Sequence, residues 1–187
     1  MKALRMLLVF LAIPLGARGA AMPEAVFILD ASGSMTEAAG AQTKIEAAKA
    51  VLAQVVPAVA PEVKIGLAAY GHRRENDCTD IEVLVPPGNE DRAAVMARIA
   101  AMQPKGMTPI SAAITQVAGL LKGRDAETTI VLVSDGEETC AGDPCAVAQS
   151  LKTAGVKFVM HVVGFAVTDK AKAQLECIAQ AGGGKYF

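Results

Sequence analysis

A hydrophobic run and a polar turn meet in the sequence VFILDASGS, residues 26–34. The residues before Asp30 are apolar without alternation, which predicts a strand buried on both faces of a parallel sheet. Ser32 and Ser34 follow on alternate positions around a glycine, which lets the backbone turn tightly. One carboxylate and two hydroxyls are hard oxygen donors, which suit Mg2+, Ca2+ or Mn2+. The alternative interpretation is a helix-capping turn, in which these oxygens only accept backbone hydrogen bonds.

The N-terminal residues have the pattern of an export signal. Two basic residues precede an apolar stretch from Met6 to Leu15, and small residues follow. This predicts a secretory signal peptide over residues 1–21, and the sequence does not choose between cleavage after Gly19 and after Ala21. The apolar stretch is too short to span a bilayer. We therefore expect a periplasmic or secreted protein with one domain, residues 22–187, and no membrane span after cleavage.

Composition excludes some classes of partner. The 18 basic and 19 acidic residues are scattered, and no Lys/Arg cluster of the kind that grips phosphates occurs. Tryptophan is absent and other aromatic residues are few, so little material exists for stacking on bases or sugars. We expect no nucleic-acid partner.

Export to an oxidising compartment predicts two disulfides among the four cysteines. Three pairings are possible and the sequence does not decide among them, although we favour Cys78 with Cys140 and Cys145 with Cys177. A zinc site is the competing interpretation, but the paired C-x2-C spacing of such sites is missing.

Apolar runs alternate with helical patterns along the chain. The runs predict strands at residues 26–30, 63–70, 81–85, 128–134 and 157–164. Capping residues predict helices from Thr43 to about Val56, from Asn89 to about Met102, from Thr108 to about Leu121, from Asp143 to about Thr153, and from Asp169 to near Ala181. This order predicts an α/β fold, a doubly wound, Rossmann-like, mostly parallel sheet with helices on both faces. The connection before residues 81–85 is short, so that strand is expected to be an antiparallel edge strand, stopped by Pro86-Pro87-Gly88.

Ligands of doubly wound sheets bind beyond the carboxyl ends of the strands, where the winding direction reverses. In the strand order 3-2-1-4-5-6, that place lies between the first and fourth strands. Asp30 ends the first strand and Asp135 follows the run at residues 130–133. Thr108, before the preceding helix, is expected at the same rim. The sequence therefore predicts a crevice with two carboxylates and three hydroxyls.

The segments DASGSM, GMTPI and SDGEE contain, in order, the pattern Asp-x-Ser-x-Ser, Thr and Asp. With this pattern, about Glu24 to Phe187 resembles a von Willebrand factor type A (VWA) domain with a metal-ion-dependent adhesion site, of the bacterial secreted single-domain type. The family usually continues into another helix, so we expect the last C-terminal helix to be absent. Whether the chain is a fragment stays open.

The resemblance implies a role for each residue of the pattern. Ser32 and Ser34 would bind a divalent cation, Mg2+ or alternatively Ca2+ or Mn2+, directly, while Asp30, Thr108 and Asp135 would bind it directly or through water. A Glu or Asp of a protein partner would complete the shell. The implied function is a metal-dependent, adhesion-type protein-binding module that is not an enzyme.

Two other functions stay open from the sequence. A metal-dependent hydrolase or phosphatase could use Asp30 as a nucleophile, but a second acid and a phosphate-binding cation are not evident. A disulfide-stabilised structural domain with a vestigial site would bind no metal, and its thermal stability would not change with Mg2+.

Overall fold

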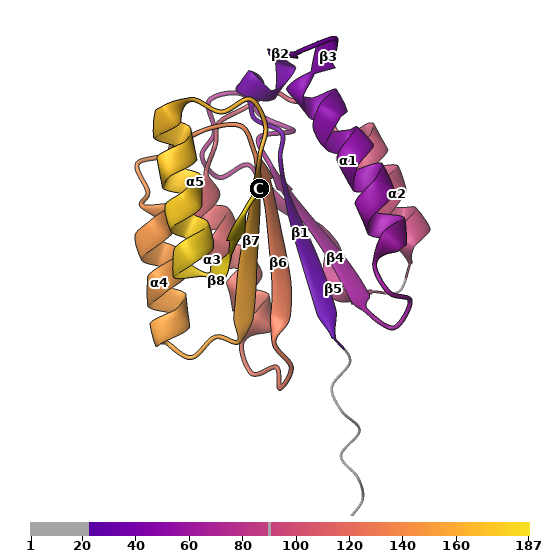
Figure 1. Cartoon of the computed structure of the whole chain (residues 1–187), viewed down its shortest axis with the longest axis vertical. Coiled ribbons are helices and arrows are strands. Elements are labelled where there is room, and N and C mark those ends of the chain that lie inside the picture. The colour runs from indigo at the N-terminus through magenta and orange to yellow at the C-terminus, as the bar shows by residue number, and fades with distance from the viewer. Residues whose placement is uncertain (1–22, 90) are drawn as a thin grey trace, which may run out of the picture.

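The structure, a computed structural model, describes residues 23–89 and 91–187, so the predicted signal peptide lies outside the described residues. A six-stranded sheet with the order β5-β4-β1-β6-β7-β8 forms the centre of this part of the chain (Figure 1). Within this sheet, β4 and β5 pair antiparallel and the other neighbouring strands pair parallel. The predicted fold class and edge strand are confirmed. The strands are β1 (Glu24–Asp30), β4 (Lys64–Tyr70), β5 (Ile81–Asn89), β6 (Thr128–Ser134), β7 (Phe158–Gly164) and β8 (Gly183–Tyr186).

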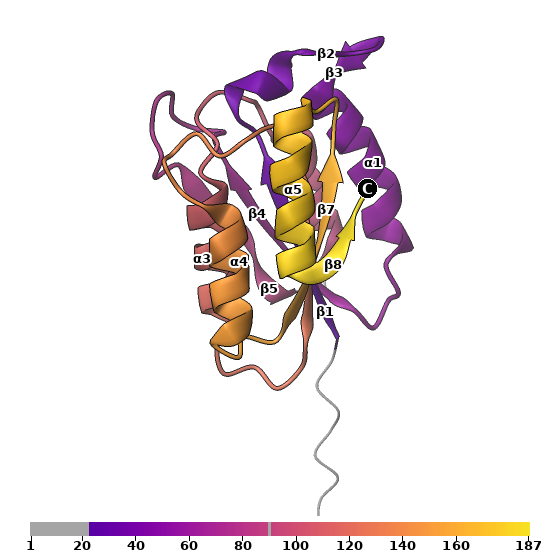
Figure 2. The same ribbon diagram turned by 60° about the vertical axis from the view of Figure 1, so that its left-hand side comes forward.

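Helices cover both faces of the sheet, as Figures 1 and 2 show. One face carries α1 (Lys44–Ala58) and α2 (Arg92–Ala101). The other carries α3 (Ile110–Leu121), α4 (Pro144–Thr153) and α5 (Asp169–Ala181). No helix of the described residues has the length and apolar character needed to cross a membrane.

The central strand β1 explains why the layers hold together. Val26 and Ile28 belong to the core beneath α3 and α5, whereas Phe27 and Leu29 belong to the core beneath α1. All four side chains are at most 2% exposed. Burial of alternate residues on opposite faces is the reason why the run is continuously apolar, and each such side chain contributes about 1.5–3 kcal/mol of transfer free energy.

Helix starts are predicted less well than strands. Thr43 forms the expected capping box with Glu46, and Asp143 caps α4. The prediction for Asn89 is wrong, because Asn89 pairs with Ile65 in β5. The helix is capped instead by Asp91, whose side chain accepts a hydrogen bond from Ala94 N.

The start of α3 also shifts. The N-cap position of α3 is Pro109 rather than Thr108, and the N-cap residue itself provides no side-chain hydrogen bond. Helix α5 begins at Asp169 as predicted, and its N-cap is Thr168, whose side chain accepts a hydrogen bond from Ala171 N. The residue that fills an N-cap is set by the exit direction of the preceding loop, which a list of favourable residue types does not contain.

Loop and strand ends contain further differences. Strand β5 does not stop at Pro86 but continues to Asn89, with register shifts opposite Leu67. A prolyl residue is compatible with this edge strand, since it needs no N–H on the open side. Three short elements were not predicted, namely η1 (Gly33–Thr36), β2 (Ala38–Ala39) and β3 (Gln42–Thr43). The favoured disulfides, Cys78–Cys140 and Cys145–Cys177, are both present.

Candidate metal centre

Asp30 lies at the carboxyl end of β1 and is fully buried. Its Oδ1 accepts a hydrogen bond from Ser32 N at 2.8 Å. Its Oδ2 accepts hydrogen bonds from the Tyr70 hydroxyl at 2.9 Å and from the Ser134 hydroxyl at 2.6 Å. Both donors sit at the ends of neighbouring strands, because β4 and β6 flank β1 in the sheet. Both carboxylate oxygens of Asp30 are therefore held by the protein itself.

Burial also changes the protonation equilibria around Asp30. Burial, followed by the charge of Asp135, raises the pKa of Asp30 above its ordinary value, and the hydrogen bonds oppose this. Burial, followed by the charge of Asp30, raises the pKa of Tyr70 well above its ordinary value. Tyr70 therefore keeps its proton and donates a hydrogen bond to Asp30.

The two serines connect Asp30 to the second carboxylate. Ser32 Oγ lies 3.1 Å from Ser34 Oγ, and Ser34 Oγ donates to Asp135 Oδ1 at 2.9 Å. Ser32 and Asp135 are buried, with 1% and 4% of their surfaces exposed. Asp135 follows β6, the strand next to β1. The order of the strands thus brings together residues that are 101 positions apart in the sequence.

Thr108 is placed by a loop that packs tightly against the turn after β1. Gly33 N donates to Gly106 O at 2.9 Å, and Gly106 N donates to Gly71 O at 2.7 Å. A Cβ at Gly106 would lie 2.2 Å from the carbonyl oxygen of Arg74, so only glycine allows this approach. The result is that Thr108 lines the same pocket as Ser34 and Asp135.

The loop after β6 holds the backbone of Thr108 on both sides. Thr108 N donates to Thr139 Oγ1 at 2.8 Å, and Thr139 N donates to Thr108 O at 3.1 Å. Glu138 accepts from Ser111 N at 2.7 Å. These bonds replace the helix-capping role considered for Thr108. Within the described residues its hydroxyl has no hydrogen-bond partner, so it is available to a ligand.

A disulfide fixes this loop from the outside. Cys140 follows Thr139 directly and is bonded to Cys78 in the β4–β5 connection. The same connection contains Asp80, which is fully buried and accepts hydrogen bonds from Arg73 N and Arg74 N at 2.7 and 2.9 Å. The loop with Thr139 is therefore tied to a second loop with an ordered interior.

A lysine that the sequence did not identify contacts the site. Lys44 is the first residue of α1, and its ammonium lies 2.8 Å from Asp135 Oδ2 and 2.7 Å from Glu37 Oε2. The residue is only 6% exposed. Burial alone would lower the pKa of Lys44, but the hydrogen bonds to Asp135 and Glu37 raise it above its ordinary value. The ammonium is therefore charged.

These residues surround a pocket of about 240 Å3 at the carboxyl edge of the sheet. The donors that face it are oxygen atoms of hydroxyl and carboxyl groups, which suit hard divalent cations. No group of three His, Cys, Asp or Glu residues in the described ranges is arranged to hold a metal. A cation at this place would therefore depend on hydroxyl ligands. The pocket lining is Ser34, Glu37, Lys44, Thr108, Asp135, Gly136, Glu137, Thr139, Thr168 and Ala171.

Sequence reasoning identified the carboxylates and hydroxyls of this edge and missed the residues that hold them. The structure connects Asp30, Ser32, Ser34 and Asp135 by hydrogen bonds and places Thr108 beside them. The missed residues are Tyr70, Ser134, Lys44, Glu37 and Thr139. Tyr70 and Ser134 end strands next to β1, and this position was a usable signal.

The chain is similar to two Bacillus subtilis (strain 168) proteins that are described as uncharacterized. It is 27% identical to YwmD over 169 residues, which are 86% of this chain and 75% of YwmD. It is 28% identical to YwmC over the same length, which is 86% of this chain and 74% of YwmC.

Three solved structures have the same fold at low sequence identity. A von Willebrand factor type A protein from Catenulispora acidiphila has a TM-score of 0.68 at 20% identity, over 88% of this chain and 38% of that one. The von Willebrand domain of the type V pili tip protein Mfa5 from Porphyromonas gingivalis has a TM-score of 0.63 at 15% identity, over 89% and 88%. Proximal thread matrix protein 1 from the mussel byssus, with a zinc-occupied metal-ion-dependent adhesion site (MIDAS) motif, has a TM-score of 0.63 at 17% identity, over 88% of this chain and 41% of that one.

The chain spans 38% of the first of these structures and 41% of the mussel protein. A family model described as von Willebrand factor type A domain matches residues 25–138, which include all of β1 except Glu24, the turn after it and Asp135. On this match and on the shared fold, the chain belongs to the von Willebrand factor type A domain family.

Proposed function

We propose that the chain is a metal-dependent protein-binding module. In this proposal a divalent cation is held by Asp30, Ser32, Ser34, Thr108 and Asp135, and an acidic side chain of a partner protein completes its coordination. The observation that carries the proposal is the hydrogen-bonded series from Ser32 through Ser34 to Asp135, next to the unpartnered hydroxyl of Thr108 in one pocket.

The residues present fit a hard cation. Ser34, Thr108 and Asp135 line the pocket and would offer oxygen atoms directly. Asp30 is fully buried with both oxygens bound by protein donors, so it would act through Ser32 or through water. A bound cation would supply positive charge for an incoming carboxylate. We propose Mg2+, with Ca2+ or Mn2+ as alternatives, and the zinc-occupied motif of the mussel protein supports a divalent ion in general.

The burial of Asp30 argues against the hydrolase or phosphatase alternative. A nucleophilic carboxylate needs an oxygen that can reach a substrate. Both oxygens of Asp30 are instead engaged by Ser32 N, Tyr70 and Ser134, and the residue is 0% exposed. The pili tip protein among the structural relatives agrees with binding rather than catalysis.

A periplasmic or secreted location is part of the proposal. The predicted signal peptide at residues 1–21 and the two disulfides support it, because disulfides persist in oxidising compartments.

Titration with Mg2+ and Mn2+, followed by calorimetry and by thermal unfolding, tests the proposal. A cation that binds only the folded state raises the unfolding temperature. We expect this rise for the wild type and its loss in Ser32→Ala and Asp135→Ala. The control Asp125→Ala, at the opposite edge of the sheet, should show the same rise as the wild type. Equal metal binding by all four proteins would contradict the site. A partner is then sought by capture from a native extract with Mg2+ or with chelator, using Ser32→Ala as the negative control.

A further inference from the structure

Lys44 occupies a position that is unfavourable for a lysine by helix energetics alone. It is the first residue of α1, where the helix dipole favours negative charge. Its ammonium is nevertheless held in a buried place between Asp135 and Glu37. A cation that the helix disfavours is kept there by the carboxylates that surround the pocket.

With a divalent cation bound, the charges around the pocket would balance only when Glu37 is counted. Asp30 and Asp135 together balance a divalent cation, and Lys44 then leaves one positive charge in excess. Glu37 cancels this excess, but Glu37 is different in kind, because its side chain is 63% exposed and lies in the irregular segment between η1 and β2. Asp135 is held in addition by Ser34, at 2.9 Å. Positioning of Asp135 alone therefore does not require Lys44.

We propose that Lys44 makes the pocket bind a cation together with a partner's carboxylate in preference to the cation alone. Its ammonium lowers the affinity of the pocket for the cation alone and binds the partner's acidic side chain beside the cation. Glu37 is the internal carboxylate that the partner's side chain displaces from Lys44. This inference rests on the proposed function and adds to it the chemistry that makes binding of cation and partner cooperative.

The expected occupant of Lys44 is an Asp or Glu of a protein. The ammonium has three donor hydrogens, of which Asp135 and Glu37 use two. A carboxylate that enters the pocket therefore finds a donor on Lys44, as well as the donor that Glu37 releases when it turns to solvent. Glu37 can turn because its backbone is held independently, by Glu37 N to Ser34 O at 2.9 Å and by Lys44 N to Glu37 O at 2.9 Å.

The test compares the binding of Mn2+ by calorimetry in the wild type, Lys44→Met, Glu37→Gln and the control Lys49→Met. Lys49 lies on the same helix, but its ammonium donates to Ala100 O and Met102 O, away from the pocket. We expect Lys44→Met to bind Mn2+ about tenfold more tightly, since a repelling charge near the cation is removed. Glu37→Gln should bind Mn2+ about two- to fivefold more weakly, and the control should be unchanged.

In the second measurement, acetate is added to the Mn2+-loaded proteins and the relaxation rate of water protons is followed. This rate falls when the carboxylate replaces water on Mn2+. We expect Glu37→Gln to bind acetate more tightly than the wild type and Lys44→Met to bind it at least tenfold more weakly. Weaker or equal Mn2+ binding by Lys44→Met, in a wild type that binds Mn2+, would overturn this inference and leave the proposed function standing. No Mn2+ binding by the wild type would overturn both. Because Glu37 is exposed, Glu37→Gln should fold even where Lys44→Met does not. Tighter binding of acetate by Glu37→Gln than by the wild type then supports the inference, and equal or weaker binding contradicts it.

Discussion

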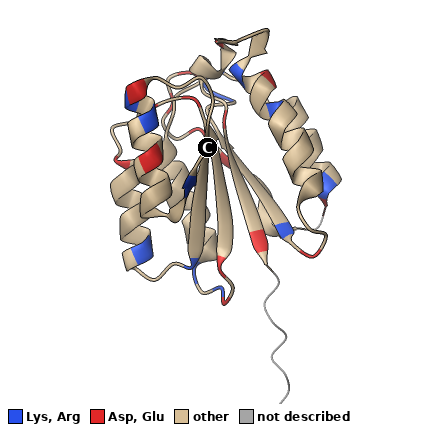
Figure 3. Cartoon of the chain, viewed as in Figure 1, with Lys and Arg blue, Asp and Glu red and all other residues tan. Residues whose placement is uncertain are grey.

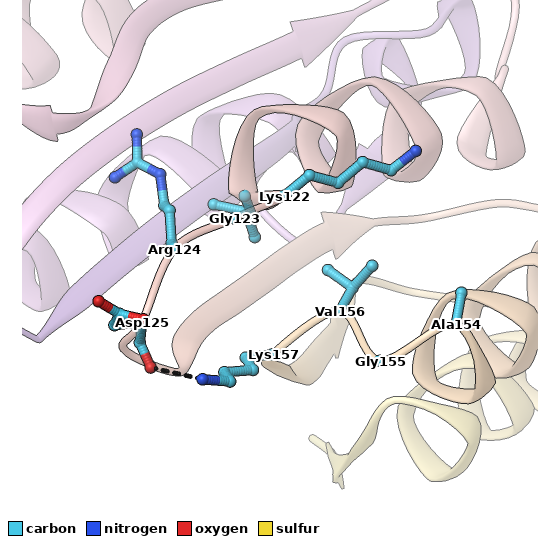
Figure 4. Close-up of a pocket in the computed structure, with 9 residues that line it drawn as sticks. Lys122, Gly123, Arg124, Asp125, Ala154, Gly155, Val156 and Lys157 are labelled. Atoms are coloured by element: carbon cyan, nitrogen blue, oxygen red, sulfur yellow. Dashed lines mark hydrogen bonds between the residues drawn. The ribbon is translucent and has the colours of Figure 1, made fainter.

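The two edges of the sheet each carry a pocket, and they are built differently. The pocket at the amino edge, before β6 and β7, has a volume of about 440 Å3, compared with about 240 Å3 at the carboxyl edge. Its polar side chains are exposed or half exposed, and Figure 4 shows Lys122 and Arg124 extending in different directions. The Lys157 ammonium donates to the backbone carbonyl of Asp125, at 3.1 Å.

At the smaller pocket, by contrast, Asp30, Ser32, Asp135 and Lys44 are at most 6% exposed, and hydrogen bonds connect them through Ser34. Burial of such polar groups costs free energy unless they are paired, and the hydrogen bonds between them offset this cost. Acidic and basic residues are otherwise interspersed along the chain (Figure 3). Buried polar connections, and not volume, therefore distinguish the candidate site.

The largest effect should come from removal of the disulfide that ties the carboxyl edge, in the variant Cys78→Ser with Cys140→Ser. The cysteines are 62 positions apart, and the loss of loop-closure constraint is worth about 4 kcal/mol in unfolding free energy. Urea unfolding measures this loss. Binding of Mn2+ should also weaken, because Cys140 follows Thr139, which holds Thr108.

The pair Cys145→Ser with Cys177→Ser is the matched control, since it joins α4 to α5 across 32 positions. It should cost about 3.5 kcal/mol and leave the Mn2+ affinity of the folded protein unchanged. Equal loss of Mn2+ affinity in both variants would remove the special status of the carboxyl edge.

After the two disulfide variants, Asp80→Ala should have the largest effect, at about 3 kcal/mol, because it leaves the backbone donors of Arg73 and Arg74 and the Arg73 guanidinium without their carboxylate. The matched change at the amino edge, Asp125→Ala, removes an exposed carboxylate and keeps the carbonyl that Lys157 contacts. It should change the unfolding free energy by less than about 0.5 kcal/mol. Urea midpoints of the two variants decide whether the edges differ as stated.

Acid provides an independent check of the same loop. Burial alone would raise the pKa of Asp80, but hydrogen bonds from Arg74 and Arg73 hold it below its ordinary value, and those from Thr79 lower the pKa of Asp77 to about 2. A lowered pKa in the folded state adds stability above the unfolded pKa of about 4, and this stability is lost as the pH falls toward 2. Asp80→Ala should therefore lose less stability between pH 5 and pH 2 than the wild type. An identical loss would show that other groups carry the acid sensitivity.

The strands and the edge that carries the site could be predicted because their signals are local or topological. The apolar run before Asp30 reflects burial on both faces, and the strand order alone brings Asp30 and Asp135 together. The prediction that Thr108 is an N-cap was wrong, because the backbone of Thr108 is hydrogen-bonded to Thr139. Such a contact between loops produces no periodic pattern in the sequence. Lys44 was missed for the same reason, since its two partners lie outside its own helix.

A smaller effect is expected from Thr139→Val, which keeps the shape of the side chain and removes the acceptor of Thr108 N. A buried N–H without a partner costs about 1–2 kcal/mol, and the affinity for Mn2+ should fall with it. The control Thr153→Val removes a hydroxyl that donates to Gln149 O on the exposed side of α4. Urea unfolding and calorimetry should show almost no effect for the control. A stable Thr139→Val protein with full Mn2+ affinity would mean that Thr108 is held in place without this bond.

A still smaller effect than that of Thr139→Val is expected from Arg124→Gln, at the amino edge. Arg124 contacts both carboxylate oxygens of Glu24, with 2.6 Å to Oε2, but 34% of its side chain is exposed. Water and salt screen such a pair, so the loss should be below about 1 kcal/mol and should shrink further when the ionic strength is raised. Binding of Mn2+ should not change, because the pair lies at the opposite end of β1 from Asp30. A loss as large as that of Asp80→Ala would mean that exposed and buried ion pairs stabilise this domain equally, and the contrast between its two edges would then lie in charge placement alone.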